Sequence, residues 1–435
     1  MKNPKMNWGR AVLVSLPFFA LMLFWQAYDY VIPLVLSGHY HLSTTLYSVI
    51  MSADNVIALI FLPLFGALSD RITGRLGRRT PLILSGTLGG IAGLFLMNLE
   101  DEKAVAGNVR FLPFLIFLII TVFFMSLNRA PAATVVTDCF IRPQRTKANA
   151  VLNLMGGIAG VLFGVFGHLL IKEVNGISHF SRCILFVASG MFTALTVYFF
   201  AVREVRFVKH VQDLNESLGL IDEKTDTASK EPVRLKRDEL RSLFCILGSV
   251  LFIYMGYNGF HTHYSNFLTR HLLKSASWTG PYLLEVGMGM LMMIPAAFIT
   301  TALGRKKSSL LGMLCCVAGY FGASTVTPEK PELLYLWFFI AAAGYPLFAI
   351  NLGPMVLELG QDNESGRFMG YYYAAVTIAQ IFTPTLASIF INRFDYGIIG
   401  FYGAVFTSLA FLVMLPVTHG DVKPDFLKAL EDSTS

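Results

Sequence analysis

Long apolar runs separated by short polar segments extend through most of the chain. A helix needs about 20 mostly apolar residues to cross the hydrocarbon core of a bilayer. Runs of this length predict an all-α polytopic membrane protein, since the strands of a transmembrane barrel would alternate polar and apolar residues over about ten positions. Twelve spans are expected, at residues 11–36, 43–69, 81–98, 111–137, 148–171, 182–202, 243–268, 278–303, 309–325, 333–358, 368–391 and 397–417. The third and ninth spans are short in this interpretation.

One long polar stretch separates the sixth expected span from the seventh. Residues 203–242 are rich in charged side chains and predict a linker that contains some amphipathic helix lying on the membrane surface. The expected organisation is an N-terminal six-helix half, a cytoplasmic linker, a C-terminal six-helix half and a cytoplasmic tail, at residues 1–202, 203–242, 243–417 and 418–435.

The distribution of basic residues predicts the orientation of the spans. Lys and Arg are enriched in cytoplasmic loops. With the N-terminus inside, 25 of the 34 Lys and Arg residues fall on the cytoplasmic side, 8 fall outside and Arg129 lies within a span. Both termini are therefore expected in the cytoplasm, in a multi-pass protein of the cell membrane. The first apolar run exceeds the about 7–15 residues of a signal-peptide core, so it is expected to be the first span.

Composition supports the membrane assignment and narrows the function. The chain is 54% hydrophobic and 14% charged, whereas soluble domains carry roughly 25% charged residues. The net charge of +6 does not indicate a nucleic-acid partner, because the basic residues lie in short loops beside apolar spans. The cysteines show no zinc-type spacing and are expected to be free packing residues; they are Cys139, Cys183, Cys245, Cys315 and Cys316.

The two halves look like weak repeats. The segment that begins at Gly77 resembles the one that begins at Gly304, 227 residues later. Pro131 and Pro354 are 223 residues apart, and Arg145 and Arg367 are 222 apart. Two six-helix halves related by an axis along the membrane normal, with substrate held between them near mid-membrane, are typical of facilitator transporters.

A short, strongly basic loop at residues 66–81 carries the most specific motif, in which Asp70-Arg71 is followed by Gly77-Arg78-Arg79. It resembles the loop between the second and third helices of the major facilitator superfamily, which usually reads Gly-x-x-x-Asp-Arg-x-Gly-Arg-Arg. The longer spacing here resembles the glycoside–pentoside–hexuronide:cation symporters, including the sucrose–proton symporters. Residues 128–150 and 344–380 are similar to segments of the same group. The resemblance implies a major facilitator fold and a transport function.

The loop and neighbouring helix ends are expected to form a cytoplasmic latch, which bonds helix ends in the outward-facing state and releases them in the inward-facing state. The alternative is that these charges only set the topology. The candidate latch residues are Gly66, Asp70, Arg71, Arg75, Gly77, Arg78, Arg79, Asp138, Arg145, Glu358 and Arg367.

Three ionisable residues within spans are candidates for coupling transport to an ion, because charges at mid-membrane are unfavourable by about 2.5–3.5 kcal/mol or more. At about 1.5 Å per residue, Asp29 lies about 28 Å from Arg10, and Asp54 about 24 Å from Asp70. Arg129 lies about 14 Å from Asp138 on the same scale. These depths predict a cluster in which Arg129 and bound substrate set the protonation of a carboxylate. The alternative is a fixed interhelical ion pair.

Candidate substrate ligands are the polar and aromatic side chains within the spans. Tyr257, His261 and Tyr264 recur at helical spacing on one face, which suits a sugar ring but also an aromatic belt at the membrane interface. The second half is expected to lack a buried acid–base pair, and Glu285 is expected to be solvated. For the remaining positions helix packing is the alternative. The full set is Asn55, Asn128, Tyr257, Asn258, His261, Tyr264, Asn351, Tyr372 and Gln380.

The favoured function is secondary active transport of a saccharide, coupled to protons. Melibiose–sodium relatives carry a second aspartate one turn after the first, where this chain has Ala58, and this departure favours protons over sodium. No cofactor and no metal are expected, since His261 and His263 point away from each other on a helix. A lysolipid or drug transporter is the alternative, and a membrane receptor or enzyme is a weaker one. We expect a monomer that binds a small-molecule substrate in the lipid bilayer.

Overall fold

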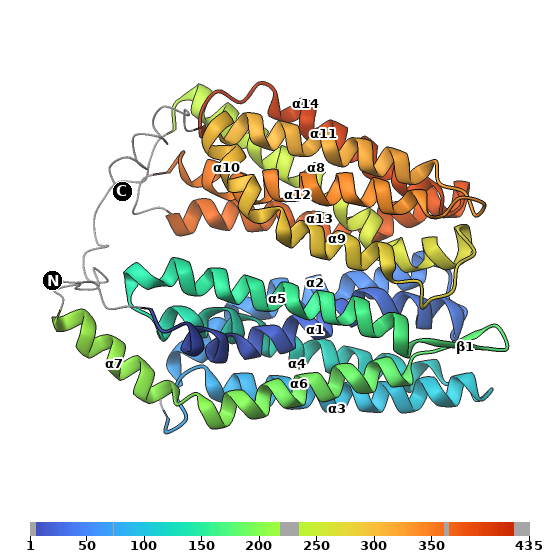
Figure 1. Ribbon diagram of the computed structural model, residues 1–435, viewed down its shortest axis with the longest axis horizontal. Helices are drawn as coiled ribbons and strands as arrows, with labels where there is room; N and C mark the ends of the chain where they lie inside the picture. Colours follow the sequence, from blue (N-terminus) through green and yellow to red (C-terminus); the bar gives the residue numbers. More distant parts are fainter. Residues whose placement is uncertain (1–5, 73, 218–234, 361–364, 422–435) are drawn as a thin grey trace. The chain divides into compact units, whose positions relative to one another are not determined.

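The computed structural model describes residues 6–72, 74–217, 235–360 and 365–421, and almost all of its regular structure is helical (Figure 1). The helices and strands in chain order are α1 (Trp8–Gly38), α2 (Thr44–Arg71), α3 (Thr80–Val105), α4 (Phe111–Asp138), α5 (Arg142–Leu170), β1 (Lys172–Val174), β2 (Ile177–His179), α6 (Ser181–Ala201), α7 (Glu204–Ser217), α8 (Arg237–Asn266), η1 (Phe267–His271), α9 (Gly280–Leu291), α10 (Met293–Leu303), α11 (Arg305–Ser324), α12 (Leu333–Leu357), α13 (Ser365–Phe394) and α14 (Ile398–Met414).

Each of the twelve expected spans coincides with a helix or with consecutive helical segments. Among the described residues, nine helices are long and apolar enough to cross a bilayer, and α9 with α10 form a tenth span that is bent by 48°. Two shorter or more polar helices, α11 and α14, occupy the remaining expected spans; α11 begins with three consecutive basic residues at Arg305. The prediction of an all-helical membrane protein is confirmed.

The chain divides into two compact units, and helix α2 contributes to both. The first unit comprises Met1–Leu42 and Ala53–Lys224, and the second comprises Ser43–Ser52 and Thr225–Ser435. The first turns of α2 therefore belong with the C-terminal helices, which the apolar pattern does not reveal. Their polar side chains explain this membership: Tyr47 Oη lies 2.7 Å from His263 Nδ1 and 3.1 Å from Tyr396 Oη.

Small residues let helices approach closely within each unit. In the second unit, a Cβ on Gly312 of α11 would lie 2.5 Å from the carbonyl oxygen of Gly344 on α12, and the reverse distance is also 2.5 Å. In the first unit, a Cβ on Gly86 of α3 would lie 2.8 Å from Asn128 of α4. Such contacts are typical of membrane helices, whose association depends on close packing because lipid removes the hydrophobic driving force between them.

The third span is longer than expected, since α3 continues to Val105 rather than ending at residue 98. The added turns contain acidic residues that find partners. Lys103 Nζ lies 2.6 Å from Glu100 Oε1, and His39 Nδ1 lies 2.6 Å from Asp101 Oδ1. Because these carboxylates are paired, they can be buried in the last turns of a helix, although the hydropathy pattern assigns the same residues to a loop.

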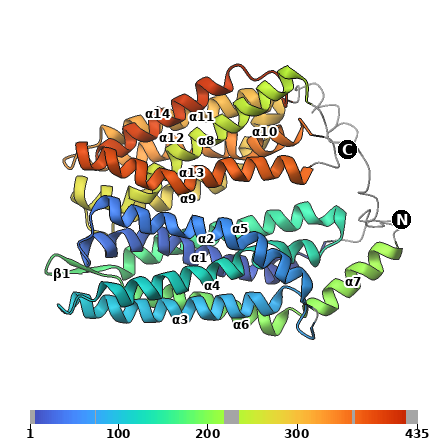
Figure 2. The ribbon, with the colours of Figure 1, turned by 180° about the vertical axis from the view of Figure 1, so that it is seen from behind.

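His39 also holds the β-hairpin that joins α5 to α6. Strands β1 and β2 pair antiparallel, and the hairpin projects beyond the ends of both helices (Figures 1 and 2). His39 Nε2 donates to the carbonyl oxygen of Ser178 at 2.9 Å. Burial lowers the pKa of His39, but the hydrogen bond and charge of Asp101, the Ser178 carbonyl and the charge of Glu102 outweigh burial and raise that pKa above its usual 6.5.

The expected linker begins with a helix, α7, that runs from the end of α6 at the opposite end of the unit from the hairpin (Figure 1). Its first residue, Glu204, is 2% exposed and accepts backbone N–H groups at the start of α3. Oε1 accepts from Arg78 at 2.8 Å and Arg79 at 2.9 Å, and Oε2 accepts from Thr80 at 2.7 Å. The first N–H groups of a helix have no partner within it, and their partial positive charge favours a carboxylate. Glu204 therefore caps α3 from a distant part of the chain.

Gly77 makes this cap possible. Its φ is 102°, in the region that favours glycine. A Cβ there would lie 2.5 Å from Glu204 Cδ. The motif glycine thus lets the loop turn and lets the carboxylate reach the backbone.

We expect Glu204→Gln to destabilise the protein by about 2–3 kcal/mol, because the amide keeps one acceptor oxygen but turns an NH₂ group toward buried donors. The thermal unfolding temperature in detergent should fall by several degrees. The matched control is Glu173→Gln on the exposed hairpin, which should leave it unchanged. Equal unfolding temperatures for both variants would contradict the capping role.

The raised pKa of His39 predicts that part of the stability depends on pH. A proton bound more tightly in the folded state stabilises that state below the usual His pKa of 6.5, and this contribution is lost as the pH rises through the higher pKa of folded His39. The unfolding temperature of wild type relative to His39→Asn should therefore decline over that pH range. His210→Asn, on exposed α7, is the control. A constant difference at all pH values would refute the prediction.

Candidate functional site

The three ionisable residues expected within spans meet in the first unit. Asp54 of α2 is buried at 8% exposure, and its carboxyl group lies within electrostatic range of Asp29 on α1 and Arg129 on α4. Asp54 Oδ1 accepts a hydrogen bond from Asn55 Nδ2 at 2.9 Å. Asp29 is exposed and Arg129 is half-buried. The three side chains therefore form one electrostatic cluster.

Aromatic residues of α1 line this cluster and were not anticipated from the sequence. The guanidinium carbon of Arg129 lies 5.4 Å from the centre of the Trp25 ring, within the range of a cation–π contact. Tyr28 packs edge-on against Trp25 with ring centres 5.3 Å apart, and it interacts electrostatically with both Asp54 and Asp29. The signal for Trp25 was its position three residues before Tyr28 and four residues before Asp29, on the same face of α1.

Two of the expected substrate ligands instead join helices to one another. Asn128 of α4 is fully buried and donates through Nδ2 to Thr87 Oγ1 of α3 at 3.0 Å. Asn351 of α12 is 2% exposed and donates to Thr300 Oγ1 at 2.9 Å and to the Leu347 carbonyl at 2.7 Å. Both amides thus join neighbouring helices, but Asn128 Oδ1 has no hydrogen-bond partner among the described residues, and the role of Asn128 and Asn351 as substrate ligands stays a prediction.

The polar and aromatic face of α8 is present in the second unit. The Tyr257 ring stacks on His261 with centres 3.9 Å apart and an angle of 30°. Tyr345 of α12 packs against Tyr257 at 5.1 Å. Tyr264 is buried, and its ring stacks on Tyr282 with centres 6.0 Å apart. The expected helical face therefore packs against aromatic side chains of α9 and α12.

The remaining candidates of this unit lie on α8 and α13. Asn258 is half-buried on α8, and so is Gln380 on α13. Tyr372 of α13 is 8% exposed, and its hydroxyl lies 3.4 Å from that of Tyr254 on α8. The hydroxyl pair joins the two helices.

The second unit does contain an acid–base pair, contrary to expectation. Glu285 Oε1 of α9 lies 3.0 Å from His261 Nε2 of α8, and the two side chains are 12% and 19% exposed. Glu285 was expected to be solvated because it lies near the end of an apolar run. The bend of 48° between α9 and α10 makes depth along the run a poor guide to burial.

His263, two residues after His261, forms a separate buried network. Its Nε2 donates to the carbonyl oxygen of Pro384 at 3.1 Å, which leaves Nδ1 to accept from the Tyr47 hydroxyl at 2.7 Å. The Tyr47 hydroxyl lies 3.1 Å from that of Tyr396. The members of this network come from segments far apart in the sequence, so no local pattern indicates it.

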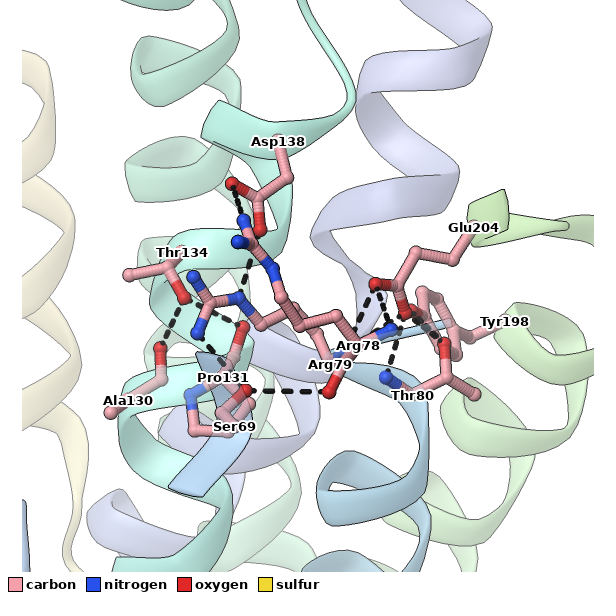
Figure 3. Close-up of polar contacts among 10 residues, drawn as sticks. All are labelled: Ser69, Arg78, Arg79, Thr80, Ala130, Pro131, Thr134, Asp138, Tyr198 and Glu204. Atoms are coloured by element: carbon pink, nitrogen blue, oxygen red, sulfur yellow. Dashed lines mark hydrogen bonds and ion pairs between the residues drawn. The ribbon is translucent and has the colours of Figure 1, made fainter. Parts of the chain in front are cut away.

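The basic loop forms a network with the end of α4 (Figure 3). Arg78 Nη2 lies 2.8 Å from Asp138 Oδ1, and Arg79 Nε donates to Asp138 Oδ2 at 2.8 Å. Arg79 Nη1 also donates to Ser69 Oγ at 3.0 Å. The structure thus brings together three of the candidate latch residues and adds Ser69 and Glu204.

Other latch candidates are placed as follows. Arg75 is exposed, and Glu358 forms an ion pair with Arg305 in which Nη1 and Oε2 are 3.1 Å apart. Backbone positions are described for the rest, but their side chains lie outside the described part of the structure: Gly66, Asp70, Arg71, Arg145 and Arg367.

Comparison with known proteins identifies the family. The profile of the Major Facilitator Superfamily matches residues 14–303 and 285–429. The General alpha-glucoside permease of Schizosaccharomyces pombe (strain 972 / ATCC 24843) is 24% identical over 221 residues, which make up 48% of this chain and 40% of the permease. The match thus spans less than half the length of that relative.

Solved structures show the same fold. A D-xylose-proton symporter has a TM-score of 0.68 at 16% identity, covering 95% of this chain and 99% of that chain. The inward open xylose transporter XylE from E. coli has a TM-score of 0.66 at 17% identity, with coverage of 96% and 98%. Peptide transporter POT in complex with sulfate gives 0.69 at 14% identity, with coverage of 97% and 94%. The chain belongs to the Major Facilitator Superfamily.

Proposed function

We propose that this transporter moves a saccharide together with a proton by alternating access. The observation that carries the proposal is the cluster of Asp29, Asp54 and Arg129 beside the Trp25 and Tyr28 rings. The name of the S. pombe permease and the fold shared with a D-xylose-proton symporter support this substrate class.

The charges of the cluster suit proton coupling. One arginine can balance one of two carboxylates, so the other is a surplus acid that can bind and release a proton. Asp54 is buried while Asp29 is exposed. Protonation of Asp54 therefore removes a charge from a site of low dielectric constant. Substrate that binds Arg129 would compete with Asp54 for the arginine and so change how readily the acid releases its proton.

The proposal also includes the coupling ion, the membrane, the orientation of the chain and the oligomeric state. Ala58 lies one turn after Asp54 and offers no second carboxylate, which supports a proton rather than sodium. The predominance of basic residues on one side supports cytoplasmic termini in a cell membrane. The transporter acts as a monomer.

The experiment that tests the function is uptake by the purified protein in liposomes under an inward proton gradient. Labelled disaccharides and monosaccharides would be compared while internal pH is recorded. Saccharide uptake accompanied by acidification is expected. If no saccharide enters with either a proton or a sodium gradient, the substrate proposal fails and a lysolipid assay follows.

Asp54→Asn should abolish concentrative uptake but leave exchange of labelled for unlabelled substrate, because the neutral amide mimics the protonated acid and cannot release a proton. Uptake and exchange are measured in the same liposomes. Asp213→Asn on exposed α7 is the control and should retain both activities. Unchanged gradient-driven uptake by Asp54→Asn would exclude the coupling role.

Asp138→Asn should slow maximal transport by about tenfold, because it weakens two charged contacts worth about 1.5–3 kcal/mol each and shifts the balance between conformations. Substrate affinity should change little. The control is Arg75→Gln in the same loop, whose exposed side chain should be dispensable. A wild-type rate for Asp138→Asn would leave Arg78 and Arg79 with a topological role alone.

A further inference from the structure

The contact between His261 and Glu285 is close but not aligned as a hydrogen bond. The two atoms are 3.0 Å apart, yet His261 Nε2 is among the buried polar atoms that lack a hydrogen-bond partner within the described residues. Asn258 Nδ2, one turn earlier on α8, is another. Buried polar groups are rarely left in this state, because an unpaired donor or acceptor has lost its water without gaining another hydrogen bond.

These polar atoms lie beside a flat aromatic surface. The Tyr257 ring stacks on the His261 ring at 3.9 Å, and Tyr345 extends the surface from α12. A small-molecule site typically combines an aromatic wall with a few convergent polar groups. A pyranose ring offers a complementary pair of features, namely an apolar face and hydroxyls at its rim.

The carboxylate makes the site selective. Glu285 is 12% exposed, it lies within electrostatic range of the buried Tyr320 and Cys316 on α11, and its described ion-pair partner is His261. A hydroxyl that donates to a carboxylate forms a charge-assisted hydrogen bond, which is about twice as strong as a neutral one. Its oxygen can at the same time accept from the imidazole or from Asn258.

We propose that Tyr257, His261 and Glu285 form the saccharide-binding site of the second unit. The aromatic pair contacts the apolar face of one sugar ring, and Glu285 accepts a specific hydroxyl that also contacts His261. This inference rests on the proposed function and deepens it, because it assigns hydroxyl selectivity to residues outside the Asp54 cluster.

The test pairs a protein variant with a change in the ligand. Equilibrium binding of a labelled α-glucoside disaccharide is measured for wild type and Glu285→Gln, and then for analogues that each lack one hydroxyl. In wild type, one deoxy analogue should bind about tenfold more weakly than the parent sugar, as a lost charged hydrogen bond implies. In Glu285→Gln the parent should bind about tenfold more weakly, and the difference between parent and that analogue should nearly vanish.

Controls separate a binding role from a structural one. Glu329→Gln, an exposed carboxylate of the same unit, should leave affinity and the analogue pattern unchanged. If Glu285→Gln does not fold, His261→Gln serves instead and should weaken the same hydroxyl preference. An analogue pattern identical in wild type and variant would overturn the inference while transport remains intact. Failure of wild type to bind or transport any saccharide would instead overturn the proposed function.

Discussion

A carboxylate buried in the protein must have a partner, and this constraint shapes the structure at every level. Asp101 pairs with His39, Glu285 with His261, and Glu204 with the backbone at the start of α3. Each partner comes from a different segment of the chain. Because a buried charge is unfavourable without its partner, each pair favours one specific contact between segments. Asp54 differs from these carboxylates, because its neighbours include a second carboxylate, Asp29, as well as Arg129. An arrangement with surplus acid suits a group that changes its protonation.

The apolar pattern predicted the helices well because a bilayer demands long runs without charge. The spans at residues 11–36 and 111–137 match α1 and α4 within a few residues. The pattern failed at the end of α3, where Asp101 and Glu100 are charged but paired. Hydropathy counts a charge as solvated, whereas in the fold Lys103 of the same helix pairs with Glu100, and His39 from a distant segment pairs with Asp101.

The candidate site was predictable where it contains charged residues, because charged residues are rare within apolar spans. Asp29, Asp54 and Arg129 stand out in apolar helices, and the structure brings them together. Amides gave no such signal, because an Asn that joins helices and an Asn that binds substrate look alike in a sequence; in the structure Asn128 and Asn351 both bond a neighbouring helix. Glu204 and Tyr47 were missed because their roles depend on tertiary neighbours more than 100 and 200 residues away.

The cap that Glu204 places on α3 changes where the first half of the molecule ends. By hydropathy the half ends with α6, and the residues that follow belong to a connector. The cap makes α7 part of the first unit, since removing Glu204 would leave the N–H groups of Arg78, Arg79 and Thr80 without their acceptor. A gene divided to produce the halves as separate polypeptides should therefore be cut after Ser217 rather than after Val202. The end of the first unit is therefore set by the N-terminus of α3, which needs the Glu204 carboxylate, and not by the end of the last apolar helix, α6.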